Sequence, residues 1–132
     1  MNERLTVFKD FVSSLSTLSK CKERAVAAVI TDSNLSQVYS IGINGGPKGG
    51  TNCLCAPDKR YGCTHAEINA LVKCLCPDTD KIMIISVSPC VQCATAIINA
   101  PGGFQAVYWI EEWKNKDGIH LLNDAKIENR LI

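Results

Sequence analysis

Two short motifs bring together residue types that could do metal chemistry. His65 and Glu67 are separated by one alanine, and further along the chain Pro89 directly precedes the pair Cys90 and Cys93. Zinc is commonly bound by imidazole and thiolate groups, and three protein ligands leave the open fourth position that a catalytic zinc site needs. The sequence therefore predicts a catalytic zinc site with His65, Cys90 and Cys93 as ligands.

Glu67 is predicted to act beside the metal rather than to bind it. Zinc makes a bound water acidic, and a neighbouring carboxylate can take its proton and pass it on. The order of the two motifs matches the signature of zinc deaminases, whose glutamate is not a ligand. We therefore expect hydrolytic deamination, with zinc-bound hydroxide attacking an amino-substituted ring and Glu67 as the proton shuttle.

A structural zinc site is the competing interpretation, because C-x-x-C pairs also occur in closed four-ligand sites. The second motif has no nearby fourth ligand, and a structural site has no use for an unliganded carboxylate. The catalytic interpretation is favoured.

The first turns of two helices should position these side chains. Cys90 and Cys93 are three residues apart at the start of a predicted helix, so both thiolates can point the same way, and the helix dipole favours their ionised forms. His65 and Glu67 are two residues apart, which suits the irregular start of a helix better than its middle. Two helix N-termini are expected to converge on one zinc ion.

The whole chain is predicted to form a three-layer α/β/α sandwich around a central five-stranded mixed sheet. Apolar residues at helical spacing predict a helix over residues 2–19, and β-rich runs around the turn at 32–34 predict a hairpin. Strands and helices then alternate, which favours right-handed crossovers and mainly parallel strands. The predicted strands are 24–31, 37–43, 82–87, 104–110 and 126–132, and the later helices are 66–76, 90–100 and 117–124.

Residues 44–62 are predicted to form a long surface loop, because glycine and proline interrupt any regular element there. Such a loop buries little apolar surface, so another interaction should order it. A second, closed zinc site formed by Cys21, Cys53 and Cys63, with Cys55 as a further candidate, would do so. The alternative is that these cysteines are ordinary small buried residues.

Composition limits the classes of function. A net charge of +1 gives no broad basic field of the kind that nucleic-acid binding requires. No apolar run is long enough to cross a bilayer and no cleavable signal opens the chain, so we expect a cytoplasmic protein without a membrane partner. Eight cysteines in such a chain favour metal-binding thiolates or small buried side chains over disulfides.

The chain resembles the cytidine deaminase superfamily, and within it the compact phage and bacterial deoxycytidylate (dCMP) deaminases. This resemblance implies a cytidine deaminase-like fold in one zinc-dependent domain over residues 1–132. It also implies conversion of dCMP to dUMP and ammonia, and a homo-oligomer, either a hexamer or a dimer. The segments that carry the resemblance are Ser19–Cys21, Asn44–Gly49, His65–Ala70, Ser88–Ala94 and Val107–Tyr108.

The same resemblance suggests substrate-binding residues. Asn44 matches a family asparagine that contacts the sugar, although an asparagine before Gly45 is also an ordinary turn residue. Arg24 and Lys48 are candidates for the phosphate, and a solvated surface charge is the alternative for each. Trp113 follows an acidic pair, where family members often carry a phosphate-binding tyrosine. An indole offers an N–H but no hydroxyl, so the choice between nucleotide and nucleoside stays open.

Three other functions remain open. Another cytosine nucleoside or nucleotide deaminase would use the same residues. A tRNA adenosine deaminase shares both motifs, but residues 61–64 read Tyr-Gly-Cys-Thr where those enzymes carry Asp-Pro-Thr, and the near-neutral charge disfavours RNA. A non-catalytic zinc scaffold would have no need of Glu67. We therefore expect a small nucleotide, not a nucleic acid, as the partner.

Overall fold

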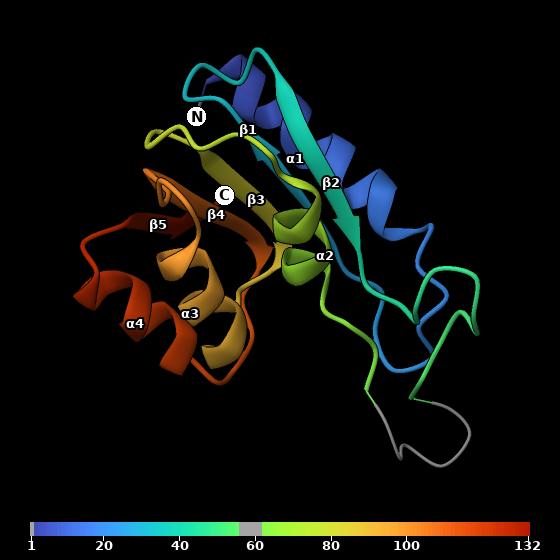
Figure 1. Cartoon of the computed structure of the whole chain (residues 1–132). Coiled ribbons are helices and arrows are strands. Elements are labelled where there is room, and N and C mark those ends of the chain that lie inside the picture. The colour runs from blue at the N-terminus through green and yellow to red at the C-terminus, as the bar shows by residue number, and fades with distance from the viewer. Residues whose placement is uncertain (1, 56–61) are drawn as a thin grey trace.

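The computed structural model describes residues 2–55 and 62–132. A five-stranded sheet with the strand order β2-β1-β3-β4-β5 forms the centre of the molecule (Figure 1). The strands are β1 (Ala27–Thr31), β2 (Val38–Ile43), β3 (Ile82–Val87), β4 (Ala106–Glu111) and β5 (Glu128–Leu131), and the helices are α1 (Glu3–Ser16), α2 (Ala66–Lys73), α3 (Val91–Asn99) and α4 (Asp117–Asp124).

The sheet is mixed, as predicted. β1 pairs antiparallel with β2 and with β3, whereas β3, β4 and β5 are parallel. The predicted hairpin is confirmed, because Ala27 pairs with Ile43 and Ile30 with Ser40 across it. The parallel half brings the ends of β3 and β4 to one edge of the sheet, where the following helices begin.

Helices cover both faces of the sheet, which confirms the three-layer sandwich (Figure 1). α1 contributes Leu5 and Val12 to a core with Ala27 and Val29, while α2, α3 and α4 pack on the other face against Ala28 and its neighbours. Successive residues of a strand point to opposite faces of the sheet. Because helices cover both faces, every residue of β1 is buried.

Some predicted boundaries are wrong. α1 ends at Ser16 rather than residue 19, and α2 ends at Lys73 rather than residue 76, because Cys74 is extended. Pro77 disfavours helical conformation in the residue before it, which also works against a longer α2. β1 begins at Ala27 rather than residue 24, because the N–H of Val26 and the carbonyl oxygen of Arg24 are bonded to the side chain of Asn44.

The part of the chain that the structure describes contains no helix long and apolar enough to cross a membrane. Residues 56–61 of the predicted loop lie outside the described residues.

Candidate active site

Two helix N-termini bring the predicted zinc ligands together. His65 is the N-cap residue of α2, Cys90 is the N-cap residue of α3, and Cys93 lies in the first turn of α3. The Nδ1 atom of His65 is 3.2 Å from the Sγ atom of Cys93 and 3.5 Å from that of Cys90. These three residues, which we call the three-ligand cluster, hold their ligand atoms within 4.8 Å of one another.

Close backbone packing fixes the start of α3. Cys90 is extended, and its Sγ atom accepts a hydrogen bond from the backbone N–H of Cys93, 3.5 Å away. Gly118 of α4 lies directly against the segment before the helix, since an added Cβ would collide with the carbonyl oxygen of Pro89 and lie 2.8 Å from that of Cys90. α4 therefore packs against the segment that carries the cysteine pair.

The charges in the three-ligand cluster are coupled. The Cys93 thiol donates to Cys90, and this hydrogen bond, with the nearby His65, lowers the pKa of Cys90 to about 3. The same hydrogen bond, together with burial, raises the pKa of Cys93. Cys90 also raises the pKa of His65, against the opposing effect of burial. The cluster therefore readily provides a thiolate, the form of cysteine that binds metals.

This donor set fits zinc. Two cysteine sulfurs and one imidazole nitrogen are the soft ligands of known catalytic zinc sites, and a helix N-terminus stabilises negative charge on the sulfurs. Within residues 2–55 and 62–132, no further histidine, cysteine, aspartate or glutamate joins the cluster as a fourth ligand. The arrangement corresponds to an open site rather than to a closed structural one.

Glu67 lies one residue into α2 beyond Ala66 and is only 4% exposed. Burial raises the pKa of its carboxyl group to about 7. A carboxyl group with a pKa near neutrality can both accept and release a proton, which is the property that general acid–base catalysis needs.

The three-ligand cluster opens onto a pocket of about 310 Å³, a size that suits a small organic ligand. Both predicted motifs contribute to its wall. The pocket is lined by Cys21, Glu23, Arg24, Val26, Asn44, Cys55, Gly62, Cys63, His65, Ala66, Glu67, Val87, Ser88, Cys90 and Trp113.

Asn44 is 9% exposed and braces the pocket wall. Its Oδ1 atom accepts from the hydroxyl group of Ser19 at 2.6 Å and from the backbone N–H of Val26 at 2.9 Å, while its Nδ2 atom donates to the carbonyl oxygen of Arg24 at 2.5 Å. An amide nitrogen carries two hydrogens, so one donor remains for a ligand. The structural role that Ser19 plays here was not predicted, although Ser19 lies in a segment that carries the family resemblance.

The two candidate phosphate-binding cations lie in different places. Arg24 lines the pocket and forms an ion pair with Glu111. Lys48 lies instead beside a separate cavity of about 220 Å³ that the glycine-rich loop forms. Trp113 lines the main pocket and is 38% exposed, and its backbone N–H donates to the hydroxyl oxygen of Ser88 at 2.8 Å. Of the two candidate cations, Arg24 is therefore the one that lines the main pocket.

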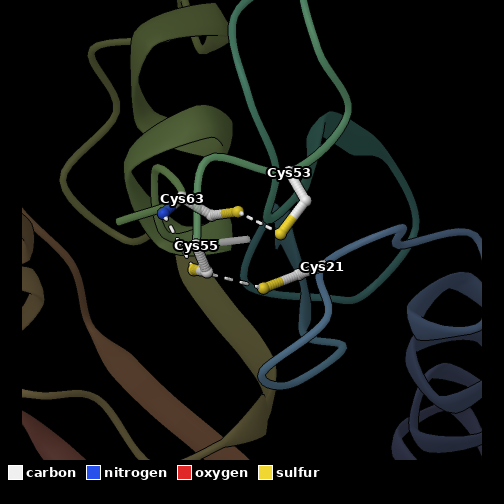
Figure 2. Close-up of side chains that lie close together, drawn as sticks. All are labelled: Cys21, Cys53, Cys55 and Cys63. Carbon is white, nitrogen blue, oxygen red and sulfur yellow. Dashed lines mark hydrogen bonds between the residues drawn. The ribbon is translucent and has the colours of Figure 1, made fainter. Parts of the chain in front are cut away.

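Cys21, Cys53, Cys55 and Cys63 form a second group, which we call the four-cysteine cluster. Their Sγ atoms lie within 4.8 Å of one another, and Figure 2 shows the four side chains close together. The Sγ atoms of Cys21 and Cys55 are 3.8 Å apart, and those of Cys53 and Cys63 are 3.6 Å apart. Burial raises the pKa of the Cys63 thiol to about 12, so a thiolate at this position needs a compensating cation.

Comparisons with known proteins show the family to which the chain belongs. The sequence pattern of the family described as "Cytidine and deoxycytidylate deaminase zinc-binding region" matches residues 2–110. The chain therefore belongs to the cytidine and deoxycytidylate deaminase family.

Individual relatives are similar over much of the chain. ComE operon protein 2 of Bacillus subtilis (strain 168) is 31% identical over 108 residues, which cover 76% of this chain and 55% of that protein. The chain thus spans about half the length of this curated relative. A crystal structure of the dCMP deaminase from the cyanophage S-TIM5, in complex with dCMP and dUMP, matches with a TM-score of 0.87 at 27% identity over 100% of this chain and 99% of that chain.

A more distant structure shares the fold alone. RibD of Acinetobacter baumannii superimposes with a TM-score of 0.73 at 19% identity, covering 98% of this chain and 35% of that chain. The cytidine deaminase-like fold is thus common to proteins of different overall length.

Proposed function

We propose that this chain catalyses the hydrolytic deamination of dCMP to dUMP and ammonia. The observation that carries the proposal is a buried carboxylate, Glu67, beside an open three-ligand cluster at the base of a pocket. Membership of the deaminase family and the likeness to a phage enzyme crystallised with dCMP and dUMP support the same substrate.

The three-ligand cluster would hold one zinc ion, and this ion when bound supplies a Lewis acid that makes a water molecule nucleophilic near neutral pH. Glu67 takes one proton from the attacking water and gives it to the ring nitrogen next to C4. It then carries the proton of the new C4 hydroxyl to the amino group, so that the C–N bond breaks and ammonia leaves. Each proton removed by Glu67 is returned to the products.

Two residues would orient the nucleotide. The remaining N–H of Asn44 is available to the sugar, and burial of this side chain fixes its direction. Arg24 would bind the phosphate by exchanging its present partner, Glu111, for the phosphate oxygens. A planar guanidinium that already lies at the pocket wall can make two parallel hydrogen bonds to phosphate.

The four-cysteine cluster would hold a second zinc ion with a structural role. Four thiolates fill the tetrahedral coordination of zinc and leave no position for water. Metal analysis tests this part of the proposal: the chain should carry close to two zinc ions, and one should remain after Cys90→Ala and Cys93→Ala are combined. A single zinc ion that disappears completely in this double variant would argue against the second site.

We also propose that residues 1–132 act as one domain and that the protein forms a homo-oligomer in the cytoplasm. Val72 near the end of α2 and Leu75 just beyond the helix are 70% and 94% exposed, and a subunit contact would remove these apolar side chains from water. The molar mass in solution, measured by light scattering, tests this expectation.

A cytosine nucleoside deaminase is the second candidate. Trp113 occupies a place in the pocket where it offers no hydroxyl group to a phosphate, and this observation favours the nucleoside. Ammonia release from dCMP, deoxycytidine, dCTP and a tRNA anticodon stem, measured in parallel, distinguishes the candidates.

The Arg24→Ala variant, measured in the same assay, tests whether the pocket binds a phosphate. The loss of a charged hydrogen-bond donor should lower kcat/KM for dCMP by about tenfold to a hundredfold and leave that for deoxycytidine unchanged. Lys48→Ala is the matched control, because it removes the same charge outside the pocket. Equal kcat/KM values for dCMP and deoxycytidine in the parent protein would contradict the nucleotide assignment.

A further inference from the structure

We propose that the four-cysteine cluster is a positioning device for the substrate pocket: a metal ion held by its four sulfurs fixes the pocket wall and thereby sets the affinity for the nucleotide. This inference rests on the proposed function for its substrate, but its structural part concerns the cluster and the wall alone. The cluster would take a divalent metal that prefers four thiolates, such as zinc.

Three separate stretches of chain meet at the cluster. Cys21 precedes the first strand, Cys53 and Cys55 come from the loop, and Cys63 lies just before α2 (Figure 2). Backbone N–H groups point at the sulfurs: that of Lys22 lies 3.2 Å from the Sγ atom of Cys53. Such hydrogen bonds to sulfur stabilise thiolates and orient metal ligands.

Two further N–H groups also point at sulfurs. The N–H of Leu54 donates to Cys63, and the N–H of Cys63 donates to Cys55, each over 3.4 Å. Four converging sulfurs with oriented donors therefore resemble a prepared metal site more than a set of packed thiols.

The cluster is also part of the substrate pocket. Cys21, Cys55 and Cys63 line the pocket together with Arg24 and His65, whereas Cys53 does not. A metal ion that holds the four sulfurs at fixed positions consequently fixes one side of the pocket. Cys53 can be changed without removing any atom from the pocket wall.

One hydrogen-bonded path joins the cluster to Asn44. The backbone N–H of Cys21 donates to the hydroxyl oxygen of Ser19 over 3.2 Å, and that hydroxyl group donates to the Oδ1 atom of Asn44 over 2.6 Å. A displacement of Cys21 therefore reaches the residue proposed to bind the sugar.

A second path runs through the backbone. Gly45 and Thr64 form an isolated β-bridge, with N–H to oxygen distances of 3.1 Å and 2.9 Å. Thr64 lies between Cys63 of the cluster and His65 of the three-ligand cluster, and Gly45 follows Asn44 directly. The bridge thus connects the cluster to both the sugar-binding residue and a catalytic zinc ligand.

The effect should fall on binding more than on chemistry. Although the bridge reaches His65, the other catalytic groups, Glu67, Cys90 and Cys93, lie at the starts of α2 and α3, which pack on the sheet through apolar side chains. Loss of the metal from the four-cysteine cluster should loosen Asn44 and Arg24 while the catalytic groups stay in place. KM should rise, and kcat should change little.

Cys53→Ser is the test, with Cys76→Ser as the matched control outside both clusters. In Cys53→Ser the zinc content should fall from two ions to one per chain, and KM for dCMP should rise by about fivefold or more at nearly constant kcat. In a Glu67→Gln background, calorimetry should show the same loss in dCMP affinity without turnover. Cys76→Ser should behave as the parent protein in each measurement.

Hydrogen–deuterium exchange gives a readout that does not depend on the substrate. Exchange in residues 44–46 and 62–65 should become faster in Cys53→Ser and not in Cys76→Ser. If Cys53→Ser misfolds, chelation of the combined Cys90→Ala and Cys93→Ala variant replaces it, because its remaining ion is the one in the four-cysteine cluster, and removal of that ion should produce the same faster exchange.

The inference is overturned if one ion per chain is lost with no change in exchange or in dCMP affinity. It is equally overturned if the parent protein carries disulfides between these cysteines in place of a second metal ion. Absence of dCMP turnover in the parent protein would reject the proposed function instead, and the metal content and the exchange would still decide whether the cluster holds the wall.

Discussion

The three-ligand cluster and the four-cysteine cluster contribute to the lining of the same pocket but are built in different ways. The three-ligand cluster occupies the first turns of α2 and α3, where helices packed on the sheet fix every ligand. The four-cysteine cluster connects segments that lie outside the helices and strands (Figure 2). The packed helices position the ligands of the three-ligand cluster. In the four-cysteine cluster, a bound metal would instead position the loop segments.

The two clusters also differ in the charged groups that surround them. A buried carboxylate, Glu67, accompanies the three-ligand cluster, and the positive ends of two helices favour negative charge there. Among the described residues, the four-cysteine cluster has four sulfurs and no acid in its ligand group. Ligand type alone therefore does not make a site catalytic; an open position and a nearby proton acceptor do.

Glu67→Gln tests this difference and should have the largest effect. The amide can neither accept the water proton nor return it, so turnover should fall by about a hundredfold to ten-thousandfold while zinc content stays the same. Steady-state kinetics and metal analysis on the same preparation measure both quantities. Glu3→Gln, an exposed substitution at the start of α1, is the control. Turnover within about tenfold of the parent value, with zinc retained, would remove Glu67 from the mechanism.

The sequence predicts the three-ligand cluster well because its spacing follows from helix geometry. Residues three apart at a helix start share a face, whatever the rest of the chain does. The buried strands are predictable for a similar reason, since continuous apolar runs such as β3 are covered on both faces. The ends of α1 and α2 depend on tertiary packing and on Pro77, so periodicity alone places them too late.

Loop contacts are harder to predict. The opposite placements of Arg24 and Lys48 depend on the path of the glycine-rich loop, which no local pattern determines. The hydroxyl group of Ser19 contacts Asn44 across 25 positions of sequence, and only a known path of the chain reveals such a pair. The four-cysteine cluster was predictable as a hypothesis from composition, but the proximity of its four sulfur atoms is a tertiary feature.

Gly118→Ala should perturb the three-ligand cluster alone and have a smaller effect than loss of Glu67. The added Cβ would collide with the carbonyl oxygen of Pro89 and push the start of α3 away, which should cost about 1–3 kcal/mol of folding stability. Zinc affinity of the three-ligand cluster should fall by about tenfold, because its supporting residues shift. Competition with a chelator measures each metal site separately.

His120→Ala, at an exposed position of the same helix, is the control for Gly118→Ala. The four-cysteine cluster should retain its metal in both variants. Simultaneous loss of both metal ions in Gly118→Ala would show that the two clusters are not built independently.

Asp32→Asn changes the β1–β2 hairpin turn, at the end of the sheet opposite the glycine-rich loop (Figure 1). It should have the smallest effect: a loss of folding stability, with no change in either cluster. The Oδ1 atom of Asp32 accepts from the backbone N–H groups of Ser36 at 2.7 Å and Gln37 at 2.9 Å. Slight burial acts to raise the pKa of Asp32, but these hydrogen bonds and that of the Ser36 hydroxyl outweigh it and hold the pKa below 3.8.

A carboxylate whose pKa is lowered by folding adds stability above its unfolded pKa of 3.8, and this stability is lost as pH falls through the lower, folded pKa. Because Asp32 is partly exposed to solvent, which screens its charge, the contribution should be at most about 1 kcal/mol. Asp32→Asn should therefore unfold more easily than Asp10→Asn, an exposed position on α1, at pH 7, and the difference should disappear at a pH below the folded pKa. Acid releases metal from both variants alike. The difference in denaturation midpoint between Asp32→Asn and Asp10→Asn, measured at pH 7 and in acid, therefore reports on the hairpin turn alone. A difference that persists unchanged in acid would mean that the charge of Asp32 does not stabilise the hairpin.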